Sequence, residues 1–159
     1  MSNITIITVG TLKENYLKEA VAEYKKRLSQ HARVDEVNIK EERIANEDDS
    51  AEIKRALEAE ADKILSAIPK GAGKIALCVE GKQYDSPALA SLIGRMADES
   101  GKIAIIIGSS HGLSDRVKRE CDVRLSFSQL TFPHQLMRVV LYEALYRSFT
   151  ILAGKKYHK

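Results

Sequence analysis

The chain has 159 residues, which suits a single domain that can bury a sizeable core. Apolar residues make up 44% and charged residues 30%, a balance that argues against disorder, and the longest strongly apolar run, residues 103–107, is far too short to cross a membrane. The net charge is only +3, but residues 101–159 carry ten Lys or Arg and four Asp or Glu, so this basic part suits an anionic partner.

Short apolar runs alternate with segments of helical periodicity along the whole chain. The runs predict strands at residues 4–9, 33–39, 74–79, 102–107 and 123–127. The periodic segments predict helices at 17–28, 53–68, 86–100, 114–120 and 134–151. Such alternation is typical of one α/β domain, here residues 1–159, with a mostly parallel sheet of five to six strands flanked by helices.

Several local signals refine these boundaries. Residues 40–50 are polar and acidic, which predicts a loop, and Asp49 with Glu52 three residues later forms a possible capping box for the next helix. Ser86 followed by Pro87 is a good helix start, as a cap before a proline in the first turn. The continuous apolar runs 75–79 and 103–107 fit central strands that helices cover on both faces.

Ligands of open α/β sheets bind beyond the carboxyl ends of the strands. This rule indicates three places: residues 81–82, the glycine-bounded loop 108–112, and residues 128–133. Glycines let backbone amides approach a ligand closely, although a simple tight turn would explain loop 108–112 equally well.

Other site classes find little support in the sequence. It contains neither GxGxxG nor GxxxxGK[ST], which argues against a nicotinamide or ATP-hydrolysing site. Ser109 and Ser110 next to His111 lack the GxSxG elbow of a serine hydrolase. The four histidines are scattered, and Cys78 and Cys121 have no partner at metal-ligand spacing, so we expect no metal site and two buried, reduced thiols.

The last predicted helix is apolar around most of its circumference. Such a helix must be buried on all sides, which favours a subunit interface over a purely central core helix. Arg138, Glu143 and Arg147 lie within it, and we expect these charges to pair or to face a ligand.

Three segments near the C-terminus resemble one known family. They are residues 126–134 (SFSQLTFPH), 138–147 (RVVLYEALYR) and the terminal 157–159 (YHK). They are similar to the RlmH family of 23S ribosomal RNA pseudouridine N3-methyltransferases, a minimal SPOUT class. The resemblance covers the whole chain, including the opening residues 8–13 and 24–28.

The resemblance implies a C-terminal deep trefoil knot and a homodimer with S-adenosylmethionine held in the knot. Because this methyl donor is already activated, we expect no metal, and because the N-terminus shows no basic region before a long apolar stretch, we expect a cytoplasmic protein. It implies methylation at N3 of a pseudouridine in the helix 69 loop of 23S rRNA in the assembled ribosome, with no DNA or membrane partner. The cofactor residues carried over by motif are Leu77, Gly108, Phe127, Ser128, Gln129, Leu130, Thr131 and Phe132. The family usually has Gly where this chain has Ser109, which leaves the loop's backbone conformation open.

Methyl transfer to a ring nitrogen requires removal of its proton. The candidates for catalysis are His134, Arg138, Tyr157 and His158: a histidine could accept the proton and an arginine could stabilise the developing anion. A frayed tail is the simple alternative for residues 157–159, but an aromatic ring beside basic groups favours contact with RNA. Two other functions remain open, a non-catalytic RNA-binding or assembly factor with a vestigial pocket and a small-molecule nucleotide-binding protein.

Overall fold

The computed structural model describes residues 1–157, and its centre is one sheet of five parallel strands in the order β2-β1-β4-β3-β5. The strands are β1 (Ser2–Val9), β2 (Ala32–Ile39), β3 (Gly73–Gln83), β4 (Lys102–Ile107) and β5 (Val123–Ser126). The helices are α1 (Asn15–Leu28), α2 (Ser50–Ala67), α3 (Ser86–Ser100), α4 (Asp115–Glu120) and α5 (His134–Leu152). The predicted α/β class with a parallel sheet is therefore confirmed, with five strands.

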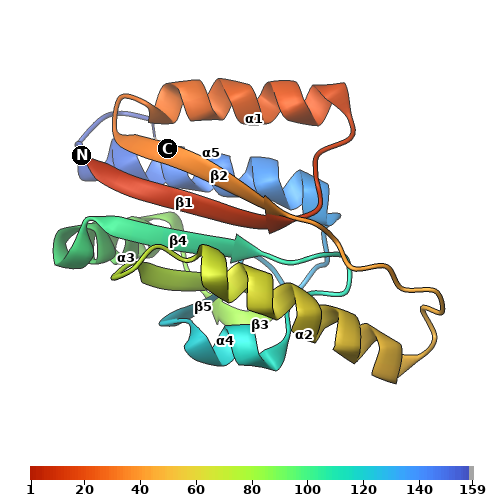
Figure 1. Ribbon diagram of the computed structural model, residues 1–159. Coiled ribbons are helices and arrows are strands. Elements are labelled where there is room, and N and C mark those ends of the chain that lie inside the picture. Colours follow the sequence, from red (N-terminus) through yellow and green to blue (C-terminus); the bar gives the residue numbers. More distant parts are fainter. Residues whose placement is uncertain (158–159) are drawn as a thin grey trace.

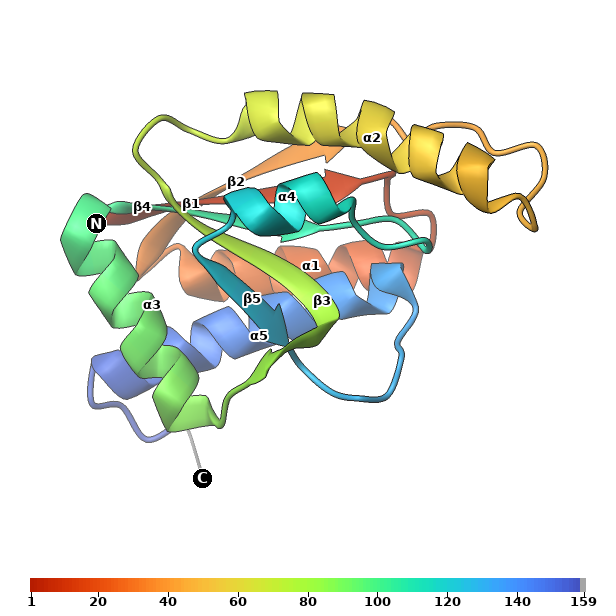
Figure 2. The same ribbon diagram turned by 90° about the horizontal axis from the view of Figure 1, so that it is seen from below.

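The helices form one layer on each face of the sheet (Figure 1, Figure 2). Helices α1, α3 and α5 cover one face and α2 and α4 the other. Alternate residues of β4 point into opposite layers: Ile103 and Ile105 pack with the first group, and Ala104 and Ile106 with the second. Burial on both faces explains why this strand is apolar throughout.

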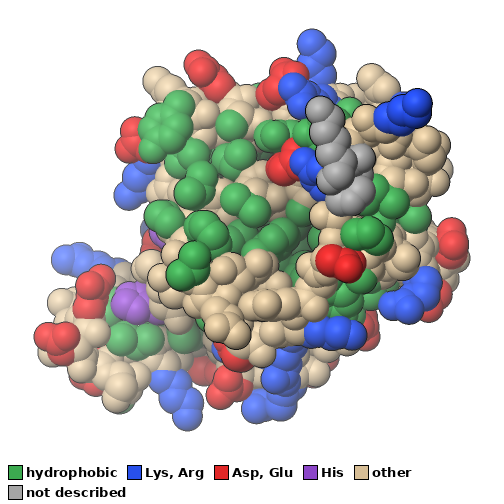
Figure 3. Space-filling view, turned by 180° about the vertical axis from the view of Figure 1, so that it is seen from behind, with side chains coloured by type: hydrophobic (Ala, Val, Ile, Leu, Met, Phe, Trp, Pro, Cys, Tyr) green, Lys and Arg blue, Asp and Glu red, His purple; other side chains and the backbone are tan. Residues whose placement is uncertain are grey.

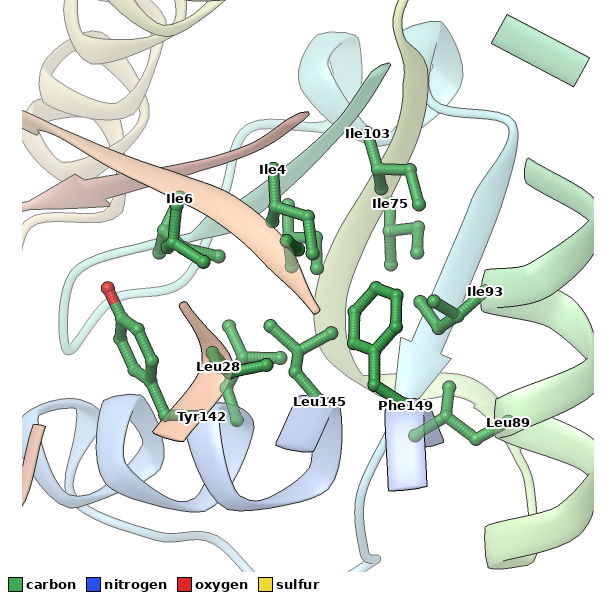
Figure 4. Packing of buried hydrophobic residues seen from close by; sticks show 14 of the residues in the cluster. Ile4, Ile6, Leu28, Ile75, Leu89, Ile93, Ile103, Tyr142, Leu145 and Phe149 are labelled. Atoms are coloured by element: carbon green, nitrogen blue, oxygen red, sulfur yellow. The ribbon is translucent and has the colours of Figure 1, made fainter. Parts of the chain in front are cut away.

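Helix α5 is the central element of its layer, between α1 and α3. Its residues Leu141, Leu145 and Phe149 are buried against strand residues such as Ile4 and Ile75 (Figure 4). One side of this helix is thus core, as the alternative interpretation expected, while Leu136 at its start stays 39% exposed.

Three local predictions need correction. Asp49 caps α2 by accepting from the amides of Ala51 and Glu52, but the Glu52 carboxylate reaches back to Ala45 and Asn46 and not to Asp49, so the capping box does not close. Helix α3 is capped by Asp85 and not by Ser86, because the Asp85 carboxylate accepts from the amide of Ala88 at 2.8 Å.

The third correction concerns the covered central strand predicted at residues 75–79. The β3–β5 register shifts between Leu77 and Lys82, so the intervening residues leave the ladder and Val79 is 50% exposed. The bulge occurs beside Gly81, where a Cβ atom would lie 2.8 Å from the Arg124 and Leu125 backbone. This irregular strand end borders a cavity at the carboxyl edge of the sheet.

Candidate functional site

A cavity of about 390 Å³ opens at the carboxyl ends of β3, β4 and β5, where the sheet rule predicts a ligand site. Its walls come from the β3 bulge, the loop after β4, the segment after β5 and the first turn of α5. Seven of the eight cofactor residues implied by the resemblance line it, and Gln129 is the one that does not. The seven are Leu77, Gly108, Phe127, Ser128, Leu130, Thr131 and Phe132.

The loop after β4 is packed too tightly for a side chain at Gly108. A Cβ atom there would lie 2.3 Å from the carbonyl oxygen of Gly112. Gly112 has a φ of 86°, whereas Ser109 avoids the left-handed region and accepts the amide of His111 on its hydroxyl at 3.2 Å. Serine therefore fits the loop without backbone strain, and Gly108 is required by the fold of the loop itself.

The β3 bulge supplies cavity residues that the sequence did not single out. Cys78, Val79 and Glu80 line the cavity, and Glu80 is paired with Lys118 of α4, another lining residue. The hydrogen bond from Lys118 lowers the pKa of Glu80, so the Glu80 carboxylate stays ionised at neutral pH. Gly81 after the third strand was the sequence signal that indicated this place.

The segment after β5 is held by its own side chains. The Ser126 hydroxyl donates to the carbonyl oxygen of Ser128 at 3.1 Å, and the Ser128 hydroxyl accepts from the amide of Leu130 at 2.9 Å. Leu130 and Phe132 are 73% and 40% exposed at the rim of the cavity. This segment thus presents an apolar edge next to the cavity mouth.

His134 is the candidate catalytic residue that lies in the cavity wall. It opens α5, and burial followed by the nearby Arg138 guanidinium lowers its pKa. An imidazole with a lowered pKa is neutral at pH 7 and can accept a proton.

Arg138 is buried but does not line the cavity. One of its Nη atoms donates to the carbonyl oxygens of Val9 at 3.1 Å and Gly10 at 2.7 Å. Within residues 1–157, its Nε finds no hydrogen-bond partner. The guanidinium therefore ties α5 to the end of β1, and burial lowers its pKa.

Tyr157 belongs to the tail that follows α5, and it packs against that helix, outside the cavity lining. Its hydroxyl donates to Glu143 at 2.8 Å, its ring meets Tyr146 edge-on with centroids 4.8 Å apart, and burial and Glu143 raise its pKa to about 12. Glu143 also pairs with Arg147 at 2.7 Å, so the expectation that the charges of the last helix pair is confirmed for these two. His158 lies outside the described residues.

The two cysteines are free and half-buried, and not fully buried as expected. Burial raises the pKa of both thiols, to about 11 for Cys121. Among residues 1–157, no group of three or more His, Cys, Asp or Glu side chains could hold a metal ion. In the same range, no helix is long and apolar enough to cross a membrane.

Comparisons with known proteins show the family to which this chain belongs. The family model described as "Predicted SPOUT methyltransferase" matches residues 2–158. Ribosomal RNA large subunit methyltransferase H of Caldicellulosiruptor bescii is 48% identical over 98% of this chain and 99% of its own length. The protein of the same name from Bacillus pumilus is 46% identical over 99% of both chains.

Solved structures support the fold at much lower sequence identity. A probable methyltransferase from Bordetella pertussis superposes with a TM-score of 0.58 at 17% identity, covering 93% of this chain and 96% of that one. A probable methylase family protein from Haemophilus influenzae gives a TM-score of 0.54 at 14% identity, covering 98% of this chain and 70% of that one. At these identities the likeness shows the fold alone.

Proposed function

This chain belongs to the family of ribosomal RNA large subunit methyltransferase H, of the SPOUT type, and from that premise we propose that it methylates large-subunit ribosomal RNA. The methyl donor in the proposal is S-adenosylmethionine, and the acceptor is N3 of a pseudouridine in the helix 69 loop of 23S rRNA. The observation that carries the proposal is the convergence of seven motif residues around one cavity at the strand ends. The assembled ribosome in the cytoplasm is the proposed substrate.

The cavity suits S-adenosylmethionine in size and in chemistry. Its volume of about 390 Å³ falls in the range of small-molecule sites. Leu77, Ile107 and Phe127 offer apolar walls for a nucleobase, and Ser128 and Glu80 offer polar groups. Because the bulge and the loop after β4 are both built around glycines without room for a side chain, the backbone itself shapes the site.

S-adenosylmethionine supplies a methyl group already activated by a positively charged sulfur. The acceptor N3 carries a proton, which must leave as the nitrogen–carbon bond forms. His134 supports this role because it lies in the cavity wall and its lowered pKa keeps the imidazole neutral. It accepts the N3 proton and passes it to water, while the walls of the cavity hold the reacting groups in place.

Arg138 and Tyr157 take other roles in this proposal. Arg138 is a positioning residue, because its hydrogen bonds to Val9 and Gly10 fix the start of α5 and with it His134. Tyr157, whose raised pKa keeps it protonated, anchors the tail on Glu143. His158 follows directly in sequence and remains a candidate for contact with the RNA base.

The proposal includes a homodimer, whose two subunits contact each other through the exposed side of α5. Apolar side chains gather on this face of the molecule (Figure 3). On α5, Leu136 is exposed and Val139 and Val140 are half-buried, while Leu130 and Phe132 are exposed at the rim of the cavity. An apolar surface of this kind at a helix that is otherwise core suits a second copy of the chain. The C-terminal trefoil knot implied by the resemblance is part of the same proposal.

The test is incubation with radiolabelled S-adenosylmethionine and ribosomes from a strain that lacks this modification. We expect the labelled methyl group to be incorporated into 23S rRNA. After digestion of the RNA to nucleosides, the label should be found in pseudouridine methylated at N3. Ribosomes that already carry the modification serve as the control and accept no label. Binding of ribosomes without methyl transfer would support a non-catalytic assembly factor. Binding of S-adenosylmethionine without any binding of ribosomes would support a small-molecule nucleotide-binding protein.

A further inference from the structure

A pair of opposite charges lies in the wall of the cavity. Glu80 belongs to the β3 bulge and Lys118 to α4, which lies beside β3, and the two side chains form an ion pair (Figure 2). Among the lining residues of the described range 1–157, Glu80 supplies the only carboxylate and Lys118 the only ammonium or guanidinium group. The other lining residues are glycines or carry apolar, hydroxyl, thiol or imidazole side chains. The pair is therefore the place in the wall where a charged part of a ligand finds fixed opposite charges.

The fold holds both charged groups at the wall. Val117 of α4 is fully buried in the core beneath α2 and α4, which fixes the position of the adjacent Lys118. Arg116 binds two carboxylates of α2 at 3.1 and 2.6 Å, so α4 is also tied to its neighbouring helix. The Lys118 side chain is 17% exposed, whereas that of Glu80 is 55% exposed. A ligand in the cavity can thus reach a carboxylate that a largely buried ammonium group holds in place.

Both members of the pair have the capacity for a further partner. The Lys118 ammonium group donates to Oε1 of Glu80, and a carboxylate has a second oxygen that accepts hydrogen bonds from a ligand. An ammonium group has three protons, so one bond to Glu80 leaves Lys118 able to donate to an anionic group as well. The ion pair therefore does not have to break for a ligand with both charges to bind beside it.

An α-amino acid group is complementary to such a pair. Its ammonium and carboxylate groups are attached to the same carbon atom, so they lie about as close together as the two charges of an ion pair. Beside Glu80 and Lys118, in the opposite order, they form an arrangement in which every charge lies next to two opposite charges. S-adenosylmethionine carries an α-amino acid group at the end of the molecule away from its nucleobase.

We propose that Glu80 and Lys118 form the subsite for the amino-acid end of the methyl donor, where Glu80 binds its ammonium group and Lys118 its carboxylate group. This inference rests on the proposed function, because that function makes S-adenosylmethionine the ligand of the cavity. Neither residue belongs to the motif from which the cofactor residues were carried over. The apolar walls accept any adenosine derivative, and the pair selects those that carry a complete amino-acid group. A pair that only ties α4 to β3 would make no such distinction between ligands.

The test measures the binding of a set of adenosine ligands by calorimetry. S-adenosylhomocysteine has both charged groups of the amino acid but a neutral sulfur, and its deaminated analogue lacks the ammonium group. Decarboxylated S-adenosylmethionine lacks the carboxylate group, and methylthioadenosine lacks the whole amino-acid part. Each of these, and S-adenosylmethionine itself, is titrated into the unmodified protein and into the Glu80→Gln and Lys118→Met variants.

Glu42→Gln is the matched control. Glu42 also pairs with a lysine, Lys63, at 2.9 Å, but it does not line the cavity. This variant should bind every ligand within about twofold of the unmodified protein, because an exposed ion pair contributes little. Melting temperatures of all variants show whether the fold persists.

The expected result is a crossed pattern of losses. Glu80→Gln should weaken S-adenosylmethionine, S-adenosylhomocysteine and the decarboxylated ligand by about tenfold, since all three carry the ammonium group. It should not weaken the deaminated analogue or methylthioadenosine. Lys118→Met should weaken the ligands that carry the carboxylate group by about tenfold, and should not weaken the decarboxylated ligand or methylthioadenosine. The unmodified protein should bind S-adenosylhomocysteine at least about tenfold more tightly than methylthioadenosine, a result that needs no variant to fold.

Equal affinity of the unmodified protein for S-adenosylhomocysteine and methylthioadenosine would overturn the proposal, as would equal losses for all ligands in both variants. Weaker binding of methylthioadenosine to Glu80→Gln would place this carboxylate at the ribose, and a loss for S-adenosylmethionine without one for S-adenosylhomocysteine would place it at the charged sulfur. Either result would overturn the proposal too. Methylation of ribosomes tests the proposed function separately: if the crossed pattern is found but no methyl group is transferred, the function fails and the subsite stands.

Discussion

At the scale of single residues, the local environment of a side chain decides its role more than its type does. His134 and Arg138 lie one helical turn apart at the start of α5, yet one faces the cavity and the other is tied to backbone carbonyls. Sequence reasoning grouped them as catalytic candidates, since both types can assist a proton transfer. Only the direction of each side chain separates a candidate base from a residue that positions it.

The first prediction concerns His134. Its pKa is lowered by burial, so its neutral form prevails at neutral pH and is lost only in acid. In single-turnover methylation, we expect the rate to fall on the acid side of this pKa and to be flat above it. His134→Gln should lower the rate by about 10² to 10⁴ and remove the acid limb. The same acid limb in the Gln variant would assign it to another group.

The buried carboxylate of Glu60 gives a second prediction. This side chain is 2% exposed, accepts the Glu42 amide at 2.9 Å, and has a pKa raised mainly by burial. A carboxyl group with a raised folded-state pKa stabilises the fold, relative to a neutral analogue, only while it is protonated. This relative stability is present below the unfolded pKa and is lost as the pH rises through the folded pKa.

Glu60→Gln provides the neutral analogue for that measurement. The melting temperature of the unmodified protein relative to the Gln variant should fall as the pH rises from about 4 to about 8. Glu58→Gln, on the same helix but partnered with Arg116 at the surface, is the matched control. A difference in melting temperature that is constant with pH would mean that Glu60 titrates alike in both states.

At the scale of helices and strands, all ten elements could be predicted from the sequence because short apolar runs mark the strands, and helical spacing or an apolar stretch of helical length marks the helices. The apolar run of β4 identifies a strand that is covered on both faces, and Gly101 ends α3 with a φ of 69°. The bulge in β3 could not be predicted, because it depends on the close approach of Gly81 to the neighbouring backbone of β5. Cavity residues Cys78 and Glu80, which lie in that bulge, were missed for the same reason.

The loop after β4 gives a prediction at this scale. Gly108→Ala would place a methyl group 2.3 Å from the carbonyl oxygen of Gly112, so the loop must shift. We expect a loss of roughly 1 to 3 kcal/mol in stability and at least tenfold weaker binding of S-adenosylmethionine by calorimetry. Ser109→Gly, which needs no such shift, should change cofactor affinity less than twofold. Equal effects of the two substitutions would contradict this account of the loop.

The C-terminal tail is a further element whose role can be tested. Residues 153–157 follow α5, and Tyr157 is held by Glu143 and Arg147. Deleting residues 157–159 should lower the melting temperature only slightly and leave cofactor affinity unchanged, because Tyr157 does not line the cavity. Methyl transfer to ribosomes should be abolished. Tyr157→Phe keeps the ring but loses the hydroxyl, and partial activity in that variant is expected. Full activity after the deletion would show that the tail is dispensable.

At the scale of the whole molecule, α5 joins the proposed functional regions. Its first turn borders the cavity, its inner side packs on the sheet, its outer side carries the proposed dimer contact, and its later part carries Tyr146, which the ring of Tyr157 meets edge-on. The sequence revealed this helix through an apolar character that extends around it. What the sequence could not separate was the side that packs on this chain's own sheet from the side that remains exposed.

The dimer prediction tests that outer side. Val140 is half-buried on the exposed side of α5, so a glutamate there stays solvated in a monomer but is buried without a partner in an apolar interface. Val140→Glu should weaken dimerisation by several kcal/mol while the fold, followed by circular dichroism, persists. Ile53→Glu, at a half-buried position on α2 in the other layer, should leave the dimer unchanged. Light scattering over a range of protein concentrations measures both. Because the motif residues around the cavity all come from one chain, a monomeric Val140→Glu protein should still bind S-adenosylmethionine. A tight dimer in that variant would place the interface elsewhere.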